Sequence, residues 1–572
     1  MKDKEMIILG LNDSNSAAAI VKDGSLIAAA REERFSRIKF DDSFPTSAIK
    51  YCLKEADIKS IKDVDQIVFG WNPGHELEPH DSSAAIRDHK HFLHYIPNNL
   101  LALVEGDKRN KKISSMEESI RFIDGKDMKI YFAPHHQCHA ASAYFVSSFN
   151  DAAILTIDAY GDDITTQLFH GVNSSIKEIA KTPYPHSLGQ VYAGVTQYLG
   201  FRSNSDEWKV MGLASYGDAE RYYREFKDII IFDRKKGELR LKLDYFTYYV
   251  WSPRRYSEQF TERFGPERYE NDEITDRHKD IAASFQKRIE DVVLEMCEYL
   301  YEKTKSKNLC LAGGVAMNSK MNGIIMEKGP FDTVWIQPSA DDAGCSIGAC
   351  FYYWNQIMGN DRTFQMEHDY WGPGFTNEEI EKVLKDSLLS YTKHEDIESV
   401  AAHLISKGNI VGWFQGRMEV GQRALGNRSI LADPRKPDMK DKVNAAVKHR
   451  ESFRPFAPSI LKEHTGEFFE TSCENPFMQM VFKVRTEKQN IIPAVTHYDG
   501  TGRYQTVSKK INPRYWRFIF FDTETITGVP ALLNTSFNDN DEPMVCSPKD
   551  AVRCYSGTGI DHLVIGNFLL SK

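Results

Sequence analysis

Short apolar runs separated by polar turns occur twice in the first 180 residues. Apolar runs at 6–11, 17–21 and 25–30 predict three strands, with the tight turn Asp23-Gly24 between the second and third. Runs at 153–157, at 165–170 and near 176 predict the same series of strand, polar turn, strand, turn and strand. This recurrence indicates an internal duplication in the first part of the chain.

The remaining apolar pattern predicts an alternation of helices and strands. Residues 79–124 are polar and partly helical, whereas apolar positions every three or four residues over 281–300 predict a long amphipathic helix. Strands are predicted at 67–70, 309–312, 410–414 and 531–533. Periodicity is lost at about 358–375, and Thr376 with Glu379 then forms a capping box. We expect an α/β protein with one domain over 1–358 and a second over 376–572.

Composition restricts the class of protein. A chain of 572 residues is too long for a single core. Its net charge of -9, with 41% hydrophobic and 27% charged residues, is typical of a soluble globular enzyme and argues against tight non-specific binding to nucleic acid. The nine cysteines never form a CxxC pair, which favours reduced thiols. No signal segment or membrane span is evident, so we expect a cytoplasmic protein with no membrane partner.

Positive charge is nevertheless concentrated in the segment 416–458. Its cations are Arg417, Arg423, Arg428, Arg435, Arg450, Arg454, Lys436, Lys440, Lys442 and Lys448. Arginine forks bind phosphate or carboxylate in a bidentate manner, and the intervening glycines let the backbone approach a ligand. A solvated basic face is the alternative, but the run FRPFAP is too apolar for one. The segment therefore predicts an anion site.

Two histidines suggest a metal site. His135 and His139 are four residues apart, so on a helix they share one face and can reach one ion. Asp158, at the end of a predicted strand, and the adjacent pair Asp341 and Asp342, in a polar turn, can supply carboxylate ligands. The alternative is that these histidines fill a core next to His136.

Several glycine-rich or polar turns are candidates for nucleotide contacts. Gly313 and Gly314 form a turn between a strand and a helix that also contains Asn318. Lys209 lies in the run EWKVMGLASYG, which closes in a turn. The aromatic and arginine residues of 245–256 could stack on a sugar or base, and a packed surface insertion is equally compatible with them. Hydroxyls and amides of 534–538 can bind phosphate oxygens.

Seven motifs, in order and over almost the full length, resemble one family. They are HHQCHAASAY, EWKVMGLASYG, GGVAMNS, PSADDAG, GRMEVGQRALGNRSI, KHRESFRPFAP and LLNTSFN. Together they are similar to the O-carbamoyltransferases of the NodU/CmcH type. The resemblance implies a duplicated actin-like (ASKHA, Kae-like) N-terminal domain and a YrdC-like α/β C-terminal domain.

The resemblance also implies two linked reactions. The YrdC-like domain would convert carbamoyl phosphate and ATP into carbamoyl adenylate, and the actin-like domain would transfer the carbamoyl group to an acceptor hydroxyl on a sugar or natural product. The implied substrate-binding residues are Arg428, Lys448, Arg454, Arg503, Ser536 and Asn538, with Lys448 and Arg454 acting in catalysis. Gly313, Gly314, Asn318 and Lys209 would bind nucleotide.

By the same resemblance, a divalent metal would be held by His135, His139 and Asp342, with Asp158 close by. His135, His139 and Asp158 are also the expected catalytic residues of the transfer step. Two imidazoles with carboxylate suit Fe(II), and Zn, Mn and Mg are alternatives. One departure concerns Ser14, which stands where the family commonly has a histidine that could assist the acceptor hydroxyl.

Other functions stay open at the level of sequence. The acceptor could be a hydroxymethyl nucleotide or DNA base instead of a sugar. An actin-like small-molecule kinase would leave the arginine-rich second domain without a role, and an ATP-switched binding protein of the Hsp70 kind would not need it for chemistry. A homodimer is compatible with all of these.

Overall fold

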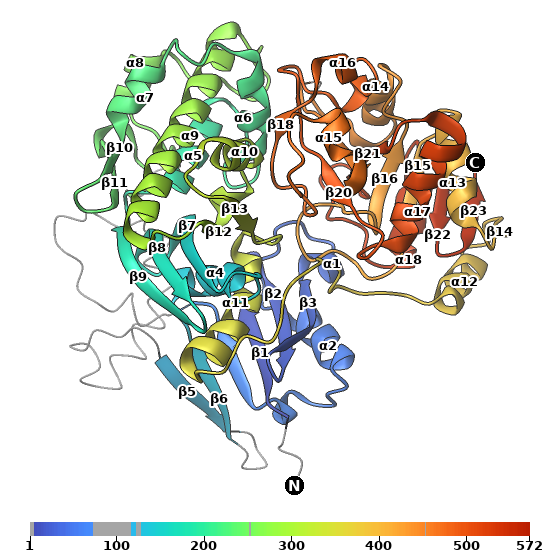
Figure 1. Ribbon diagram of the computed structural model, residues 1–572, viewed down its shortest axis with the longest axis horizontal. Helices are drawn as coiled ribbons and strands as arrows, with labels where there is room; N and C mark the ends of the chain where they lie inside the picture. Colours follow the sequence, from blue (N-terminus) through green and yellow to red (C-terminus); the bar gives the residue numbers. More distant parts are fainter. Residues whose placement is uncertain (1–4, 72–115, 122–126, 251–252, 452) are drawn as a thin grey trace. The chain divides into compact units, whose positions relative to one another are not determined.

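The computed structural model describes residues 5–71, 116–121, 127–250, 253–451 and 453–572 (Figure 1). The chain divides into two compact units. Unit 1 comprises residues 1–29, 43–45 and 52–365, and unit 2 comprises residues 30–42, 46–51 and 366–572. Most of the predicted polar region 79–124 lies outside the described residues. Both units combine helices with sheets, so the predicted α/β class is confirmed.

Unit 1 contains two sheets of related design. The first has the order β3-β2-β1-β4-β6-β5 and the second the order β13-β12-β7-β8-β9. The strands are β1 (Ile7–Asn12), β2 (Ala17–Lys22), β3 (Ser25–Arg31), β4 (Gln66–Phe69), β5 (Met116–Arg121), β6 (Asp127–Phe132), β7 (Asp151–Gly161), β8 (Ile164–Val172), β9 (Ser175–Pro183), β12 (Asn308–Ala312) and β13 (Thr333–Ile336).

The pairing repeats between these sheets. β1 is antiparallel to β2 and parallel to β4, just as β7 is antiparallel to β8 and parallel to β12. Each central strand is buried along most of its length, which matches the continuous apolar runs of the sequence. The predicted internal duplication is thus confirmed in strand order and direction.

The helices of unit 1 pack on these sheets and on one another. They are α4 (His135–Tyr144), α5 (Leu188–Tyr198), α6 (Glu207–Leu213), α7 (Tyr223–Ile229), α8 (Glu258–Phe264), α9 (Asp276–Thr304), α10 (Ser319–Lys328) and α11 (Cys345–Phe351). Helix α11 packs on β1 and β2, and α4 packs on β7 and β12. The two helices also contact each other, at Gly348, where a Cβ would lie 1.9 Å from the carbonyl oxygen of Cys138. This close approach requires glycine and brings the start of α11 next to α4.

Unit 2 is built on one eight-stranded sheet in the order β14-β23-β22-β15-β16-β21-β17-β20. Its strands are β14 (Thr392–Lys393), β15 (Val411–Phe414), β16 (Arg428–Ala432), β17 (Ala457–Leu461), β20 (Gln505–Val507), β21 (Ala531–Ser536), β22 (His562–Ile565) and β23 (Phe568–Ser571). Its longer helices are α12 (Asn377–Asp386), α13 (Ile397–Ser406), α17 (Pro513–Phe521) and α18 (Pro548–Gly557). Helix α12 begins at the predicted capping box of Thr376 and Glu379.

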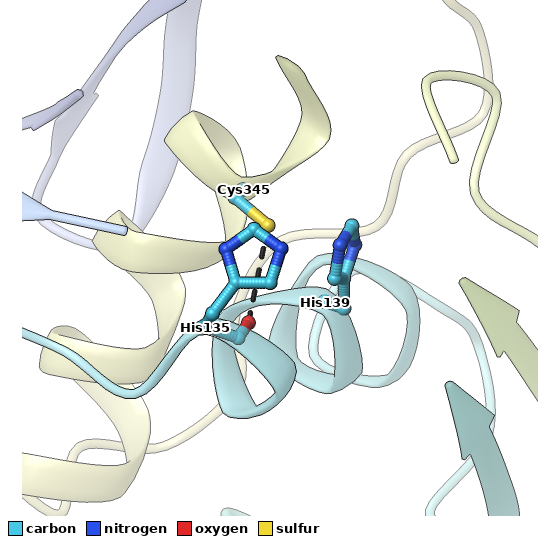
Figure 2. A group of neighbouring side chains, drawn as sticks. All are labelled: His135, His139 and Cys345. Carbon is cyan, nitrogen blue, oxygen red and sulfur yellow. Dashed lines mark hydrogen bonds between the residues drawn. The ribbon is translucent and has the colours of Figure 1, made fainter. Parts of the chain in front are cut away.

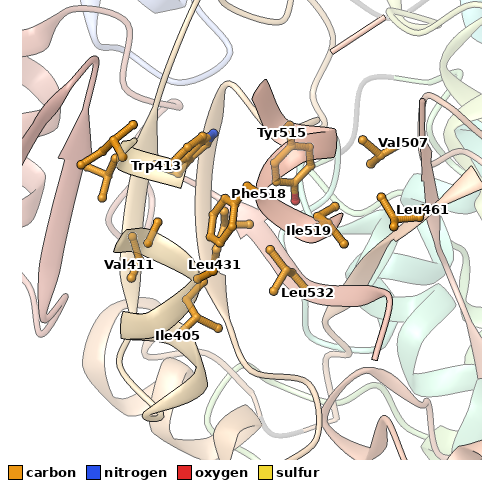
Figure 3. Packing of buried hydrophobic residues seen from close by; sticks show 14 residues of the cluster. Ile405, Val411, Trp413, Leu431, Leu461, Val507, Tyr515, Phe518, Ile519 and Leu532 are labelled. Carbon is orange, nitrogen blue, oxygen red and sulfur yellow. The ribbon is translucent and has the colours of Figure 1, made fainter. Parts of the chain in front are cut away.

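The core of unit 2 forms where α13 and α17 pack on the sheet. Trp413 of β15 and Phe518 of α17 are fully buried, with ring centroids 4.8 Å apart, and their neighbours include Leu431 and Leu532 (Figure 3). The indole nitrogen of Trp413 donates to the carbonyl oxygen of Gly426 at 2.8 Å. The core therefore anchors the arginine-rich segment directly.

A segment from near the N-terminus belongs to unit 2. It contains α1 (Glu33–Ser36) and the first part of α2 (Thr46–Glu55). Arg31 donates to the carbonyl oxygen of Val420 at 2.9 Å, and Arg34 donates to that of Gly421 at 3.1 Å. These buried arginines fix the backbone of the basic segment from a distant part of the chain.

Candidate functional site

The first turns of α4 present His135 and His139 on one face, as their spacing predicts. Pro134 precedes the helix, and the main-chain nitrogen of His135 donates to Asp162 at 2.8 Å, which satisfies one free amide of the helix start. Both imidazoles are fully buried, and their ring centroids are 4.6 Å apart. Gly161 makes room for His135, since a Cβ there would lie 2.0 Å from the imidazole.

The hydrogen bonds of the three neighbouring histidines differ. His136 has both ring nitrogens paired, with Thr156 at 2.8 Å and the carbonyl oxygen of Ile164 at 3.1 Å. His135 pairs only Nδ1, with the carbonyl oxygen of Gly70 at 3.0 Å. Because a carbonyl can only accept, Nδ1 of His135 carries a proton, and Nε2 is the nitrogen that can face a ligand. His136 is therefore a satisfied core residue, whereas His135 is oriented as a metal ligand usually is.

Two carboxylates complete this group. Nε2 of His139 lies 2.9 Å from Asp158, and Nε2 of His135 lies 3.6 Å from the same oxygen. Asp342 lies 3.5 Å from Nε2 of each histidine. The four donor atoms lie within 4.8 Å of one another, so the structure brings together all four residues predicted as metal ligands.

The charges of this group of side chains favour a cation. Burial alone would lower the pKa of His135 and His139, but Cys345, Asp158 and Asp342 outweigh it and raise the pKa of both imidazoles. Burial likewise would raise the pKa of Asp158, yet the two histidines hold it well below its ordinary value. The donor set, with the unpaired Nε2 of His135, fits a divalent ion. The fit does not distinguish among Fe(II), Zn, Mn and Mg.

Ser14 and Cys345 border the donor set. The hydroxyl of Ser14 donates to the second oxygen of Asp342 at 2.6 Å and so orients this carboxylate. The thiol of Cys345, the first residue of α11, lies against the imidazoles and donates to the carbonyl oxygen of His135 at 3.9 Å (Figure 2). Burial raises its pKa, but His139 and His135 more than compensate and lower it overall.

The residues predicted to bind nucleotide occupy two places in unit 1. Gly313 and Gly314 follow β12. A Cβ on Gly314 would lie 3.0 Å from Asp158, so this turn borders the four residues predicted as metal ligands. Asn318 caps α10 and exchanges two hydrogen bonds with Gln286 of α9. Lys209 of α6 pairs with Asp206 at 3.0 Å. Asn318 and Lys209 thus already have protein partners.

Aromatic residues of the predicted stacking segment 245–256 pack inside unit 1. Tyr248 and Tyr256 are buried, and Arg254 lies over the ring of Tyr256 with its guanidinium carbon 4.7 Å from the centroid. Residues 251–252 lie outside the described residues. These contacts agree with a packed insertion.

In unit 2, the buried Lys448 contacts two other residues predicted to bind substrate, Ser536 and Asn538. Nζ of Lys448 donates to the carbonyl oxygens of Ser536 and Asn538, at 2.7 and 2.9 Å, and to the side-chain oxygen of Asn538 at 2.7 Å. Burial, with added repulsion from Arg450, holds the pKa of Lys448 well below its ordinary value. Lys448 therefore ties the end of β21 to the basic segment.

Arg428 has a different environment. Its fully buried guanidinium lies 3.7 Å from the ring centroid of Phe414 and donates to four main-chain carbonyls. The acceptors are Gln415, Gly416, Asn427 and Pro373. Glu419 holds the adjoining turn by accepting from the amides of Leu425 and Asn427. Arg428 thus supports the loop, and its predicted contact with a substrate stays a prediction.

Further cations gather in unit 2 with few opposing charges. Burial lowers the pKa of Arg423 to about 10. The pKa of Arg450 falls to about 9, through burial and the charge of Arg454. The pKa of Arg503 falls well below its ordinary value, through burial and the charges of Arg423 and Arg450. Arg454 forms an ion pair with Glu451 at 3.3 Å. Such mutual repulsion is relieved when an anion binds.

Sequence reasoning named the main donors but missed several neighbours. Arg423 and Arg450 were visible in the basic segment, yet spacing could not show which cations are buried. Cys345 follows Asp342 by three residues, and only the packing of α11 on α4 reveals that its thiol reaches the histidines. The N-terminal arginines of unit 2 gave no local signal.

Comparison with known proteins identifies the family. A model described as carbamoyltransferase N-terminus matches residues 7–351, and one described as carbamoyltransferase C-terminus matches residues 402–572. The chain is 41% identical to the uncharacterized protein sll1178 of Synechocystis sp., over 99% of this chain and 96% of that protein. It is 38% identical to nodulation protein NolNO of Sinorhizobium fredii, over 98% of this chain and 79% of that protein.

More distant likenesses add little. Nodulation protein U of Bradyrhizobium diazoefficiens is 26% identical over 98% of this chain and 96% of that protein. Among solved structures, HypF of T. kodakarensis has 11% identity and a TM-score of 0.34, covering 62% of this chain and 48% of that one. Component A of (R)-2-hydroxyglutaryl-CoA dehydratase from Acidaminococcus fermentans has 14% identity and a TM-score of 0.31, covering 62% of this chain and 99% of that one. Similarity at these TM-scores supports no conclusion about mechanism.

Among the described residues, no helix is both long enough and apolar enough to span a membrane. Both family models match in order, and a relative above 40% identity aligns with nearly the whole chain. The protein therefore belongs to the carbamoyltransferase family and is an enzyme that transfers a carbamoyl group from a donor to an acceptor.

Proposed function

We propose that this protein is an ATP-dependent O-carbamoyltransferase that forms carbamoyl adenylate and then transfers its carbamoyl group to a hydroxyl of a sugar or natural product. The observation that carries the proposal is the contrast between a buried cation cluster in unit 2 and a buried histidine-carboxylate set in unit 1. The first suits polyphosphate chemistry, and the second suits group transfer beside a divalent ion.

Unit 2 is assigned the first reaction, and a YrdC-like fold is proposed for it. Water converts carbamoyl phosphate into carbamate and phosphate. A carbamate oxygen then attacks the α-phosphorus of ATP, which forms carbamoyl adenylate and releases pyrophosphate. Both substrates are anionic, so their approach requires fixed positive charge. Arg503, Lys448 and Arg454 are proposed to supply it.

The contacts of unit 2 suggest separate roles for its residues. Arg503 and Arg423 are half-buried cations for which the described residues provide no hydrogen bond or ion pair, so they are available to bind phosphate oxygens. Lys448 holds Ser536 and Asn538 in place and adds charge. Arg428 keeps the backbone of the loop fixed through its carbonyl contacts. We retain Ser536 and Asn538 as additional substrate contacts.

Unit 1 is assigned the transfer reaction, with an actin-like (Kae-like) fold. His135, His139, Asp158 and Asp342 would hold a divalent ion, for which Fe(II) is proposed and Zn, Mn and Mg are alternatives. When bound, the ion supplies positive charge to the adenylate phosphate and polarises the carbamoyl carbonyl. Gly313 and Gly314 would approach the adenosine, with Asn318 and Lys209 as outer contacts.

The transfer step moves one proton. The acceptor oxygen forms a bond to the carbamoyl carbon, the bond from that carbon to the phosphate oxygen breaks, and AMP leaves. The hydroxyl proton must pass to a base. Ser14 cannot serve, because its hydroxyl donates to Asp342 and is not basic at neutral pH. Asp158 is the proposed acceptor, since its carboxylate lies within the donor set, 2.9 Å from Nε2 of His139.

Product analysis tests this function. With carbamoyl phosphate and ATP present, we expect AMP and pyrophosphate, and neither should form when carbamoyl phosphate is omitted. A panel of hydroxyl-bearing acceptors is then examined by mass spectrometry for the gain of one carbamoyl group in place of hydrogen. Nucleotide and DNA acceptors belong in the panel. Formation of ADP with a phosphorylated product would instead identify a kinase and contradict the proposal.

A further inference from the structure

Cys345 contacts the same imidazoles as the two carboxylates. Ligand atoms of His135, His139 and Cys345 lie within 4.8 Å of one another, separately from the set that includes the carboxylates. The thiol comes from α11 and the histidines from α4, and Figure 2 shows the three side chains turned toward a common space. All three residues are fully buried.

The nitrogens of the histidine pair are incompletely satisfied. Nε2 of His135 and Nδ1 of His139 have no hydrogen-bond partner within the described part of the chain. A buried polar atom left unpaired is costly, and such atoms usually indicate a ligand or a functional role. The thiol of Cys345 has only a long contact, 3.9 Å, to the carbonyl oxygen of His135. Giving up that contact would cost little.

We propose that His135, His139 and Cys345 form a second donor set that binds a thiophilic divalent ion, Zn²⁺ above all, as an alternative to the histidine-carboxylate set. Thiolate with imidazole is a preferred combination for zinc, whereas carboxylates suit harder ions such as Mn²⁺ and Mg²⁺. Binding replaces the S–H bond with a sulfur–metal bond and releases the proton to water. The inference rests on the proposed metal-binding role of the histidine pair.

Two consequences follow from sharing the imidazoles. Zinc and manganese should compete for the protein, because each donor set needs the same two side chains. Their affinities should also respond differently to the loss of the thiol. Removing Cys345 should weaken zinc binding by roughly 10- to 100-fold, the range seen when a supporting group of a metal site is lost, and leave manganese binding within about twofold.

Cobalt provides the direct test. The metal-free full-length protein is titrated with Co²⁺, which takes zinc sites and shows a near-ultraviolet charge-transfer band only when a thiolate is bound. We expect this band in the wild type and in the control Cys350→Ser, whose thiol lies in the same helix and bonds instead to the carbonyl oxygens of Ile8 and Ala19. Cys345→Ser should lose the band and keep the visible ligand-field bands.

The outcomes separate this inference from the proposed function. Ligand-field bands without a charge-transfer band in the wild type, or a band that persists in Cys345→Ser, would overturn the thiolate set and leave the carboxylate set standing. Cys345→Ala is measured in parallel, with melting temperature as the check on folding. A failure of the wild type to bind Co²⁺, Zn²⁺ or Mn²⁺ would overturn both this inference and the proposed metal role. Pyrophosphate formation by unit 2 is assayed independently of either.

Discussion

The two units bury charge of opposite kinds. In unit 1, Cys345, Asp158 and Asp342 outweigh burial and raise the pKa of two histidines, so this group of side chains favours a cation. In unit 2, burial and neighbouring cations lower the pKa of Arg450 and Arg503, so this group favours an anion. Burial strengthens both preferences, because charges are poorly screened away from water. The two groups of residues therefore suit the two halves of the proposed reaction.

The largest effect should come from removing the positive charge of unit 2. We expect Arg503→Ala to lower carbamoyl-dependent pyrophosphate release by about 10²- to 10³-fold. A loss of this size follows when an enzyme loses one donor that stabilises charge in the transition state. Release of pyrophosphate is measured at saturating ATP. Lys442→Ala, which changes an exposed lysine of the same unit, is the control and should retain wild-type release. Comparable losses in both variants would mean that the buried cluster has no special role.

A smaller effect should follow when a carboxylate of the donor set in unit 1 loses a hydrogen bond. Ser14→Ala removes the 2.6 Å hydrogen bond to Asp342, and we expect metal affinity to fall roughly 10- to 100-fold. Calorimetric titration with Mn²⁺ measures this change. The matched control is Ser16→Ala, because the hydroxyl of Ser16 bonds to the carbonyl oxygen of Ser43 and not to a donor residue. Equal affinities for Ser14→Ala and wild type would remove Ser14 from the site.

The cation cluster should couple anion binding to pH. A bound anion favours the charged form of Arg450, whose pKa is about 9, so binding must raise that pKa. Between pH 9 and 10, pyrophosphate binding should therefore be accompanied by proton uptake. Above pH 9, its affinity should fall by up to roughly tenfold for each pH unit. Calorimetry in two buffers of different ionisation enthalpy measures the uptake. A pH-independent affinity with no uptake would show that Arg450 stays fully charged or does not face the anion.

The smallest expected effect concerns an acid beside the basic segment. Burial raises the pKa of Asp369 from 3.8 to about 7, although its carboxylate accepts from the amide of Gly421. The folded state thus binds a proton more tightly than the unfolded state, and stability should decline as pH rises from about 4 to 7. Asp369→Asn should remove this decline and raise the free energy of unfolding at pH 8. Denaturant unfolding at pH 5 and pH 8 measures it, and an unchanged pH dependence would contradict the assignment.

Local sequence patterns were sufficient to predict the strands of unit 1 and the histidine pair. The spacing of His135 and His139 determines a shared helix face, and Asp158 follows a run of buried apolar residues. The role of Arg428 was not visible in the sequence, because its side chain folds back on the carbonyls of Gln415 and Gly416 and also reaches the distant Pro373. Arg31 likewise reaches Val420 across 389 residues, and no local rule predicts such a contact. Which charged side chains come together depends on burial and on contacts between residues far apart in the chain. The spacing of residues along the sequence reveals neither.

The most direct test of the account separates the two partial reactions in one variant. His135→Ala removes a donor from unit 1 and leaves the cations of unit 2 unchanged. With carbamoyl phosphate, ATP and an acceptor identified by mass spectrometry, we predict wild-type initial release of pyrophosphate and no carbamoylated acceptor. Loss of both activities in a His135→Ala protein that retains the wild-type melting temperature would contradict the assignment of one reaction to each unit.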